Sequence, residues 1–383
     1  MILSFPRPPP NITFAAKKNE MATIFQTEFD SIYLTSMLPE EVEIESDQPS
    51  IEVAFYLNNL KVFASTYYPF NELVRVRDIR SILEAAMSLR NMTLANLKIV
   101  ATEPVFNEPQ VTYDENGNLH MTFDDATPDP VTETLEGIKV VYSSFRTSDD
   151  SESFLSTHFL TTRKSALLPR SGFLSLSNYT KANAQGSNYA LIYYSQQGAE
   201  GVVFTYTSTF SKILSNTEGI VNKQLSHGYF KTLVDQAVGT NSKILGAEYH
   251  IGNRQFNIFF TDEKPTEEFS FKNAFNIMET VYLYNTTTIK TEMDRSEAVC
   301  GRKTQFYDET VKIKHEVETA ALSYDEAKWL NQMLTSKLVE HPDDNGDTVQ
   351  VLISDITSEV TDSSKELIRL KFSWKYADGI EYL

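Results

Sequence analysis

The chain has 383 residues, a formal net charge of −18 and 41% hydrophobic residues. This length exceeds one ordinary core and indicates roughly two or three domains, and the hydrophobic content argues against a disordered chain. The acidic balance disfavours nucleic acid or anionic lipid as a main partner, because both require clustered Lys and Arg. The single cysteine, Cys300, excludes an intrachain disulfide and a cysteine zinc cage. No run of about 18 apolar residues occurs, so membrane insertion is not expected.

The first part of the chain combines an arm with short strands. Residues 1–21 are rich in proline, and residues 22–145 contain alternating apolar runs typical of strands. Asn58-Asn59 and Asn116-Gly117 are expected to form hairpin turns, because Asn and Gly tolerate positive φ. The stretch "RDIRSILEAAMSL" predicts one helix, with an apolar stripe on one side. The stripe comprises Ile79, Ile82, Leu83 and Ala86. Many strands with one helix predict a β-sandwich of jelly-roll type.

A second β-rich domain is predicted over residues 151–287. The polar stretch "SSFRTSDDSES" precedes it and has no periodicity, so a boundary is placed there. "YALIYYSQQGAEGVVFTY" indicates two strands with a Gly-containing loop at 198–201. "AEYHIGNRQFNIFFTDE" indicates a second hairpin, with Gly252-Asn253 in the turn. The domain closes on "FSFKNAFNIMETVYLY", two predicted strands with a short irregular link.

Residues 288–383 predict an α+β module in the order ββαββ. "TVKIKHEVET" alternates strictly, and "LSYDEAKWLNQMLTSKLV" starts with the capping box of Ser323 and Glu326 before an apolar helical stripe. Two strands follow, "VQVLISDI" and "LIRLKFSWKYA". Five apolar residues of the last strand share one face: Ile368, Leu370, Phe372, Trp374 and Tyr376. The whole chain is therefore predicted to be mainly β and multidomain, with an α+β module at its C-terminal end.

Two carboxylates are candidates for acid–base chemistry, with glycoside hydrolysis as the reaction. Glu279 comes first, because a carboxylate among apolar residues has a raised pKa, and Asp262 comes second. Neither has a recognisable partner. The favoured interpretation is structural: Asn273 and Glu279 bond backbone donors in the link between two strands, at a joint between domains.

The remaining polar candidates also favour structural roles. Cys300 has no assignable activating residue and is expected to be a buried, inert thiol. His315 lies on an apolar strand face and is expected to be a core or interface histidine. The loops "HPDDNGD" (341–347) and "DDATPDP" (124–130) lack the ligand spacing of an EF-hand and are expected to be solvated turns. No catalytic residue, cofactor or metal site is therefore predicted.

Several stretches of the chain together resemble tail structural proteins of phages and prophages of gut anaerobes. The resemblance rests on "NELVRVRDIRSILEAAM", "FSFKNAFNIMETVYLY", "DRSEAVCGRKTQFYDETVKIKHEVET", "LSYDEAKWLNQMLTSKLV" and "VLISDITSEVTDSSKELIRLKFSWKYAD". The C-terminal module also looks like the split-barrel unit of tail-tube, distal-tail and baseplate-hub proteins. The arm at 1–21 and the region 151–260 depart from this pattern.

The resemblance implies a non-enzymatic virion component that is made in the bacterial cytoplasm and assembles into a homo-oligomeric ring. Its partners would be further copies of itself and other tail or baseplate proteins. An acidic lumen would then let DNA slide without adhering. Two alternatives remain: a lectin-like adhesin that binds host surface glycans through aromatic platforms, and a glycoside hydrolase that uses Glu279.

Overall fold

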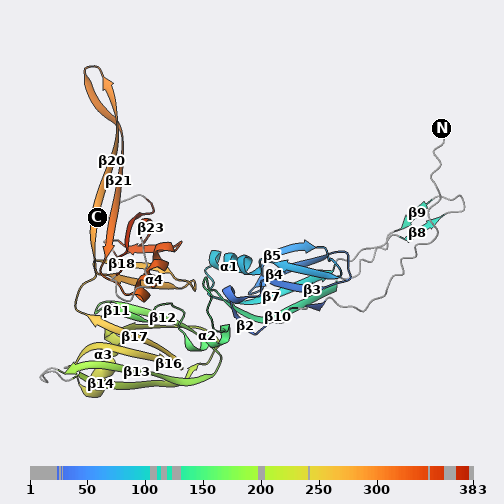
Figure 1. The fold of residues 1–383 in the computed structure, drawn as a ribbon, viewed down its shortest axis with the longest axis horizontal. Helices are drawn as coiled ribbons and strands as arrows, with labels where there is room; N and C mark the ends of the chain where they lie inside the picture. Colours follow the sequence, from blue (N-terminus) through green and yellow to red (C-terminus); the bar gives the residue numbers. More distant parts are fainter. Residues whose placement is uncertain are drawn as a thin grey trace. The chain divides into compact units, whose positions relative to one another are not determined.

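The computed structural model describes a mainly β protein (Figure 1). The residues described are 24, 25, 27, 29–103, 110–113, 119–122, 131–196, 203–239, 242–343, 346–357 and 368–378. The predicted mainly β, multidomain class is confirmed. The arm at 1–21 and the loop at 124–130 lie outside the described residues. The chain divides into two compact units, and the division falls within two strands, β7 (Leu94–Glu103) and β10 (Val131–Val141).

Unit 1 comprises Met1–Phe29, Pro39–Ile79 and Asn96–Gly137. Antiparallel strands of this unit bury every second side chain, which is the alternation that the sequence predicts. Asn58 and Asn59 have φ of 49° and 66°, so the predicted two-residue hairpin is confirmed. The strands are β1 (Ile24–Phe25), β3 (Glu41–Glu45), β6 (Leu73–Arg77), β4 (Ile51–Leu57), β5 (Leu60–Tyr67), β7 (Leu94–Glu103), β8 (Gln110–Tyr113), β9 (Leu119–Thr122) and the start of β10 (Val131–Val141).

Unit 2 comprises Asp30–Leu38, Arg80–Ala95 and Ile138–Leu383. Its first elements are short: β2 (Ile32–Leu34), the 3-10 helix η1 (Thr35–Met37), α1 (Ile79–Leu89), which begins one residue before the unit, and α2 (Ser151–Thr157). β2 runs parallel to the end of β10. The helix α1 is confirmed, and Leu83 and Ala86 of its apolar stripe are buried. The sequence missed α2, whose Asp150 caps the backbone N–H of Ser153 within the predicted linker.

A five-stranded sheet, β11-β17-β16-β13-β14, forms the middle of unit 2, beside the antiparallel pair β12-β15. The helix α3 (His227–Val238), also missed from the sequence, packs Phe230 and Val234 into the same core as Tyr249. The predicted hairpin at Gly252-Asn253 is confirmed. The strands are β11 (Ser165–Pro169), β12 (Phe173–Thr180), β13 (Ala184–Gln196), β14 (Val203–Ser215), β15 (Gly219–Ser226), β16 (Ser242–Ile251) and β17 (Arg254–Thr261).

A seven-stranded sheet closes unit 2 in the order β19-β18-β22-β23-β24-β21-β20. The helix α4 (Tyr324–Thr335) buries Leu330 and Met333 against it, and the predicted capping box of Ser323 and Glu326 is confirmed. The strands are β18 (Glu267–Lys272), β19 (Met278–Leu283), β20 (Asn285–Cys300), β21 (Lys303–Thr319), β22 (Val339–Pro342), β23 (Thr348–Thr357) and β24 (Lys371–Tyr376).

This sheet contains more strands than the predicted ββαββ module. Three strands follow α4 instead of two, because β22 has only four residues, too few to show a period of two. β18 and β19, which precede residue 288, belong to the same sheet. The five predicted apolar residues of the last strand are all buried, including Trp374 and Tyr376.

Candidate functional site: an exposed amphipathic hairpin

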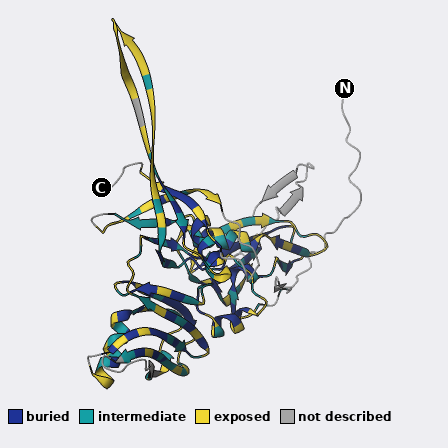
Figure 2. Cartoon of the chain, turned by 60° about the vertical axis from the view of Figure 1, so that its left-hand side comes forward, coloured by how far each residue is buried: buried dark blue, intermediate teal, exposed yellow. Residues whose placement is uncertain are grey.

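The hairpin of β20 and β21 extends beyond the sheet that holds its base. The two strands pair with each other from Asn285–Thr319 to Cys300–Lys303, whereas β21 pairs with β24 only from His315 to Glu318. Residues 289–314 therefore form a two-stranded projection, called the protruding hairpin below, which is mostly exposed (Figure 2). The β20 strand of this projection, Ile289 to Cys300, spans eleven steps of about 3.4 Å, which gives a length of about 37 Å.

One face of the protruding hairpin is apolar. The register places Met293 opposite Val311 and Thr291 opposite Ile313, and opposed residues of an antiparallel pair share a face. Ile289 is 62% exposed, and Met293 and Val311 are each 44% exposed. Six apolar side chains lie on this face, called the apolar face below: Ile289, Met293, Val299, Phe306, Val311 and Ile313. Two charged residues, Arg295 and Glu297, interrupt it near the tip, and the Arg295 guanidinium lies 4.9 Å from the centroid of the Phe306 ring.

The apolar face continues the buried face of the sheet at the hairpin base. His315 is opposite Ile289, lies buried, and stacks on Trp374 with ring centroids 3.9 Å apart. Val317, on the same face, is buried in the core under α4. The predicted alternation of "TVKIKHEVET" is therefore confirmed, but the sheet and helix cover only the half nearest the base.

The opposite face of the protruding hairpin is charged and internally paired. Lys312 Nζ lies 3.2 Å from Asp294 Oδ2, and Lys290 Nζ lies 2.7 Å from Glu316 Oε1. The segment 285–319 holds six Lys and Arg against seven Asp and Glu, in a chain whose net charge is −18. The hairpin is therefore nearly neutral, unlike the chain as a whole.

The hairpin also presents a free strand edge. β20 stands last in the seven-stranded order, so its outer edge has no strand neighbour within the described part of the chain. Unpaired backbone N–H and C=O groups on such an edge are a template for another strand. A bulge between Ser296 and Glu297 interrupts the register near the tip. The apolar face and the free edge together can bind protein.

The carboxylate of Glu279 is buried at a junction of three segments. Trp329 Nε1, on α4, donates to Glu279 Oε2 at 2.6 Å, and Asn273 Nδ2 donates to Oε1 at 2.5 Å. Asn273 Nδ2 also donates to the Leu160 carbonyl at 2.8 Å. Strand β19, helix α4 and the segment after α2 therefore meet at this carboxylate.

The two predicted strands around Glu279 are confirmed as β18 and β19, but its predicted bonding is wrong in part. Asn273 Oδ1 accepts from the backbone N–H groups of Phe275 and Ile277, as expected. Glu279 bonds side chains instead of the backbone of the link. The sequence could not show this, because Trp329 lies 50 residues away along the chain.

Burial dominates the electrostatics of this junction. It raises the pKa of Glu279, while bonds from Asn273, Thr161 and Trp329 and the charge of Arg163 act in the opposite direction. The Arg163 guanidinium lies 4.0 Å from the centroid of the Trp329 ring, and burial lowers its pKa to about 10. The cavity beside Lys272 and Gln332 is lined by Asn273, the partner of Glu279, and not by Glu279 itself.

Asp262, the second candidate carboxylate, is exposed and lies apart from this junction. It forms ion pairs with Arg170 and with Lys243, the latter at 3.0 Å. The hydrogen bond from Lys243 lowers its pKa. Such an exposed pair contributes little stability, and a lowered pKa does not suit a general acid at neutral pH.

The predicted burial of Cys300 is wrong. Its thiol is exposed at the end of β20, because the hairpin has left the sheet and both of its faces meet solvent there. His315 lies in the core, as predicted. In the "HPDDNGD" loop, the Asp347 N–H donates to Asp343 Oδ1 at 2.7 Å, which closes the turn between β22 and β23.

The described residues contain no group of three or more His, Cys, Asp or Glu placed to hold a metal. They also contain no helix with the length and apolar composition needed to cross a membrane. Comparisons with protein-family models, curated proteins and solved structures found no match to this chain.

Proposed function

We propose that this protein is a structural component of a phage tail or baseplate, and that it assembles with further copies of itself into a ring. The observation that carries the proposal is the protruding hairpin, whose apolar face is exposed in the single chain. The resemblance of the sequence to tail proteins of phages and prophages supports the same function. The protein would be made in the bacterial cytoplasm and would end in the virion.

The apolar face supports a protein partner over a soluble small molecule. It is the face of a two-stranded ribbon that carries six apolar side chains and lines none of the main cavities in the described part of the chain, whereas small molecules bind in concave sites. Ile289, Met293 and Val311 are about half exposed, so covering them in an assembly recovers roughly 1 kcal/mol each. Burying all three side chains in a contact would make the association about 100-fold tighter than the same contact without them.

A second copy of the chain is the partner that the charges favour. Two whole chains of net charge −18 repel each other, whereas the hairpin segment carries nearly equal numbers of both signs. Its free β20 edge can pair with a strand of a neighbouring copy, and a contact between two different surfaces closes into a ring.

Two hairpin variants test the proposal. The triple variant Ile289→Thr, Met293→Thr, Val311→Thr removes the apolar face while keeping residues of high strand propensity. The control Asp294→Thr, Lys312→Thr changes the charged face and also leaves the net charge unchanged. Mass photometry and negative-stain microscopy of each full chain report the copies per particle.

The expected result is a ring of several copies for the unaltered chain and the control. The triple variant should need about 100-fold more protein to assemble. Circular dichroism of the triple variant should match that of the unaltered chain, because the three side chains lie at the surface. The melting temperatures should match at a concentration where both chains are single, since assembly itself raises the melting temperature. Equal assembly of both variants, or a chain that stays single at all concentrations, would contradict the proposal.

A further inference from the structure

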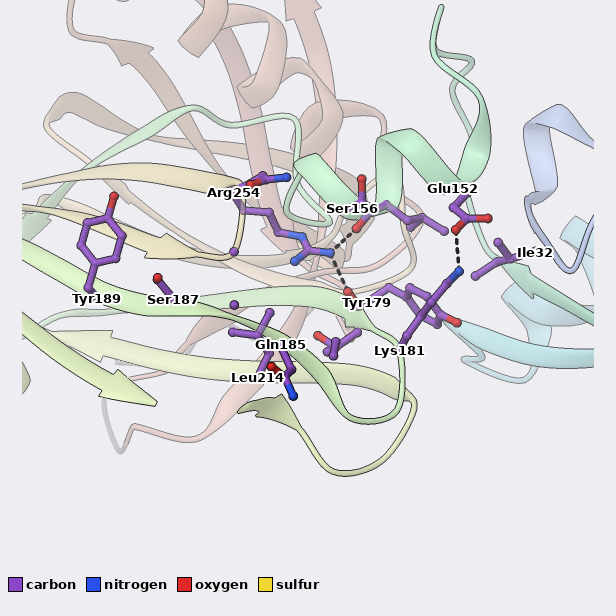
Figure 3. A pocket seen from close by; sticks show the side chains of 16 residues that line it. Ile32, Glu152, Ser156, Tyr179, Lys181, Gln185, Ser187, Tyr189, Leu214 and Arg254 are labelled. Atoms are coloured by element: carbon purple, nitrogen blue, oxygen red, sulfur yellow. Dashed lines mark hydrogen bonds and ion pairs between the residues drawn. The ribbon is translucent and has the colours of Figure 1, made fainter. Parts of the chain in front are cut away.

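A cavity of about 510 Å³ lies in unit 2, and its lining includes Ser156 of α2 and Arg254 at the start of β17 (Figure 3). Gly252 and Asn253, in the turn that joins β16 to β17, also line it. This volume is within the range of small-molecule sites, roughly 300–1,000 Å³. The cavity shares no residue with the protruding hairpin or with the Glu279 junction. Its lining is therefore separate from the hairpin on which the proposed assembly rests.

The main charge in the cavity wall is the guanidinium of Arg254, a residue only 5% exposed. Its Nε donates to the His158 carbonyl at 3.0 Å, and its Nη2 donates to the carbonyls of Leu155 and Tyr179. No carboxylate of the described residues pairs with it. Burial lowers the pKa of Arg254 to about 10, so the group is charged at neutral pH.

Part of this guanidinium is left for a ligand. The third nitrogen, Nη1, makes no hydrogen bond to a described residue. It is also not fully buried, in contrast to several other polar side-chain atoms that lack a partner. This nitrogen therefore reaches the cavity that Arg254 lines. The carbonyls at the end of α2 hold the other two nitrogens, so the side chain is already fixed in place.

The other charges of the cavity neutralise each other. Lys181 Nζ lies 2.5 Å from Glu152 Oε1, and both side chains are about half exposed. The cavity therefore carries one uncompensated positive charge in a chain of net charge −18. A ligand with a single negative charge suits this balance, since a second charge would lack a partner.

The remaining wall is polar without charge. Ser156, Gln185 and Ser187 offer hydroxyl and amide groups (Figure 3), and Leu214 adds an apolar side. The ring of Tyr189 is held by stacking on His250, with centroids 4.3 Å apart. Such a lining suits a ligand that carries several hydroxyl groups and a small apolar surface.

We propose that this cavity binds an acidic sugar, with its carboxylate on Arg254 and its hydroxyl groups on the serine and glutamine side chains. A planar guanidinium is well suited to a carboxylate, and charge-assisted hydrogen bonds are about twice as strong as neutral ones. The proposal concerns binding only and involves no chemical step.

Calorimetric titration of the full chain with glucuronate tests this inference, with glucose and cyclohexanecarboxylate as matched probes. Glucuronate should bind about 10- to 100-fold more tightly than glucose, because glucose lacks the charged group. It should also bind more tightly than cyclohexanecarboxylate, which lacks hydroxyl groups. Absence of glucuronate binding, or equal binding of glucose, would overturn the proposal.

Two serines of α2 supply the matched variants. Ser156→Trp places a large ring in the cavity, whereas Ser153→Trp changes an exposed serine of the same helix that does not line it. Glucuronate binding should be lost in the first variant and kept in the second. If both variants fold and bind glucuronate equally, the cavity is not the site. Particle mass should be unchanged in both, so this test is independent of ring assembly.

Discussion

Replacing Glu279 by Ala tests whether this carboxylate holds unit 2 together. The change removes the acceptor of Trp329 Nε1 and one of the two acceptors of Asn273 Nδ2. A buried donor left without a partner costs about 1–3 kcal/mol, and Arg163 also loses its nearby negative charge. Removing the carboxylate also removes the free-energy cost of burying its charge, which offsets part of this loss. We expect the free energy of unfolding to fall by about 3 kcal/mol.

Urea unfolding followed by tryptophan fluorescence measures this loss directly. The chain has only two tryptophans, Trp329 and Trp374, and both lie in the core between α4 and the seven-stranded sheet. A loss of about 3 kcal/mol also corresponds to a melting temperature lower by about 6–12 °C for a unit of this size. Glu292→Ala, an exposed glutamate on β20, is the control and should change the free energy by less than about 0.5 kcal/mol.

A loss below about 1 kcal/mol in Glu279→Ala would refute the structural role and restore the catalytic hypothesis. Trp329→Phe gives a second reading of the same contact, because it keeps a ring and removes the N–H donor. The two losses should be less than additive in the double variant, since both remove one hydrogen bond. Fully additive losses would show that the bond contributes nothing.

Three further predictions concern other features. Because the pKa of Glu279 is raised above 4.5, the native state binds more protons than the unfolded state from about pH 4.5 up to the native pKa. The unaltered chain should therefore lose free energy of unfolding relative to Glu279→Gln as pH rises through this window, and a pH-independent difference in urea titrations contradicts it. The thiol of Cys300 should react fully with a thiol reagent in the native chain, whereas reaction only after unfolding would show that it is buried. Gly246→Ala should lower the free energy of unfolding by about 1–3 kcal/mol, because its Cβ would lie 2.7 Å from the Ile258 carbonyl oxygen. Gly228→Ala is the control, because its Cβ would make only an ordinary contact with Ser226 Oγ at 3.9 Å, and equal stability of the two variants would refute the argument.

Local patterns predicted the elements whose signals lie close together in the sequence. The Asn58-Asn59 turn and the Ser323–Glu326 capping box depend on a few adjacent residues, and both are present. The sequence did not predict the helix α3, because it follows strand β15 directly, with Ser226 at the end of the strand as its cap.

The candidate site could not be predicted from local sequence patterns, because it depends on how distant segments pack. Alternation predicted that Val311 and His315 share a face, but it could not show where the sheet and α4 stop covering that face. Exposure of Cys300 follows from the same boundary. The partners of Glu279 and the cavity around Arg254 arise from segments distant in the sequence, which only tertiary structure brings together.

Sedimentation velocity of the unaltered full chain over about a 100-fold range of concentration, from about 1 to 100 µM, tests the proposed self-assembly, because association depends on concentration. We expect a discrete species several times heavier than the 43.5 kDa chain, whose fraction grows with concentration. A single 43.5 kDa species over the whole range would contradict assembly through the protruding hairpin.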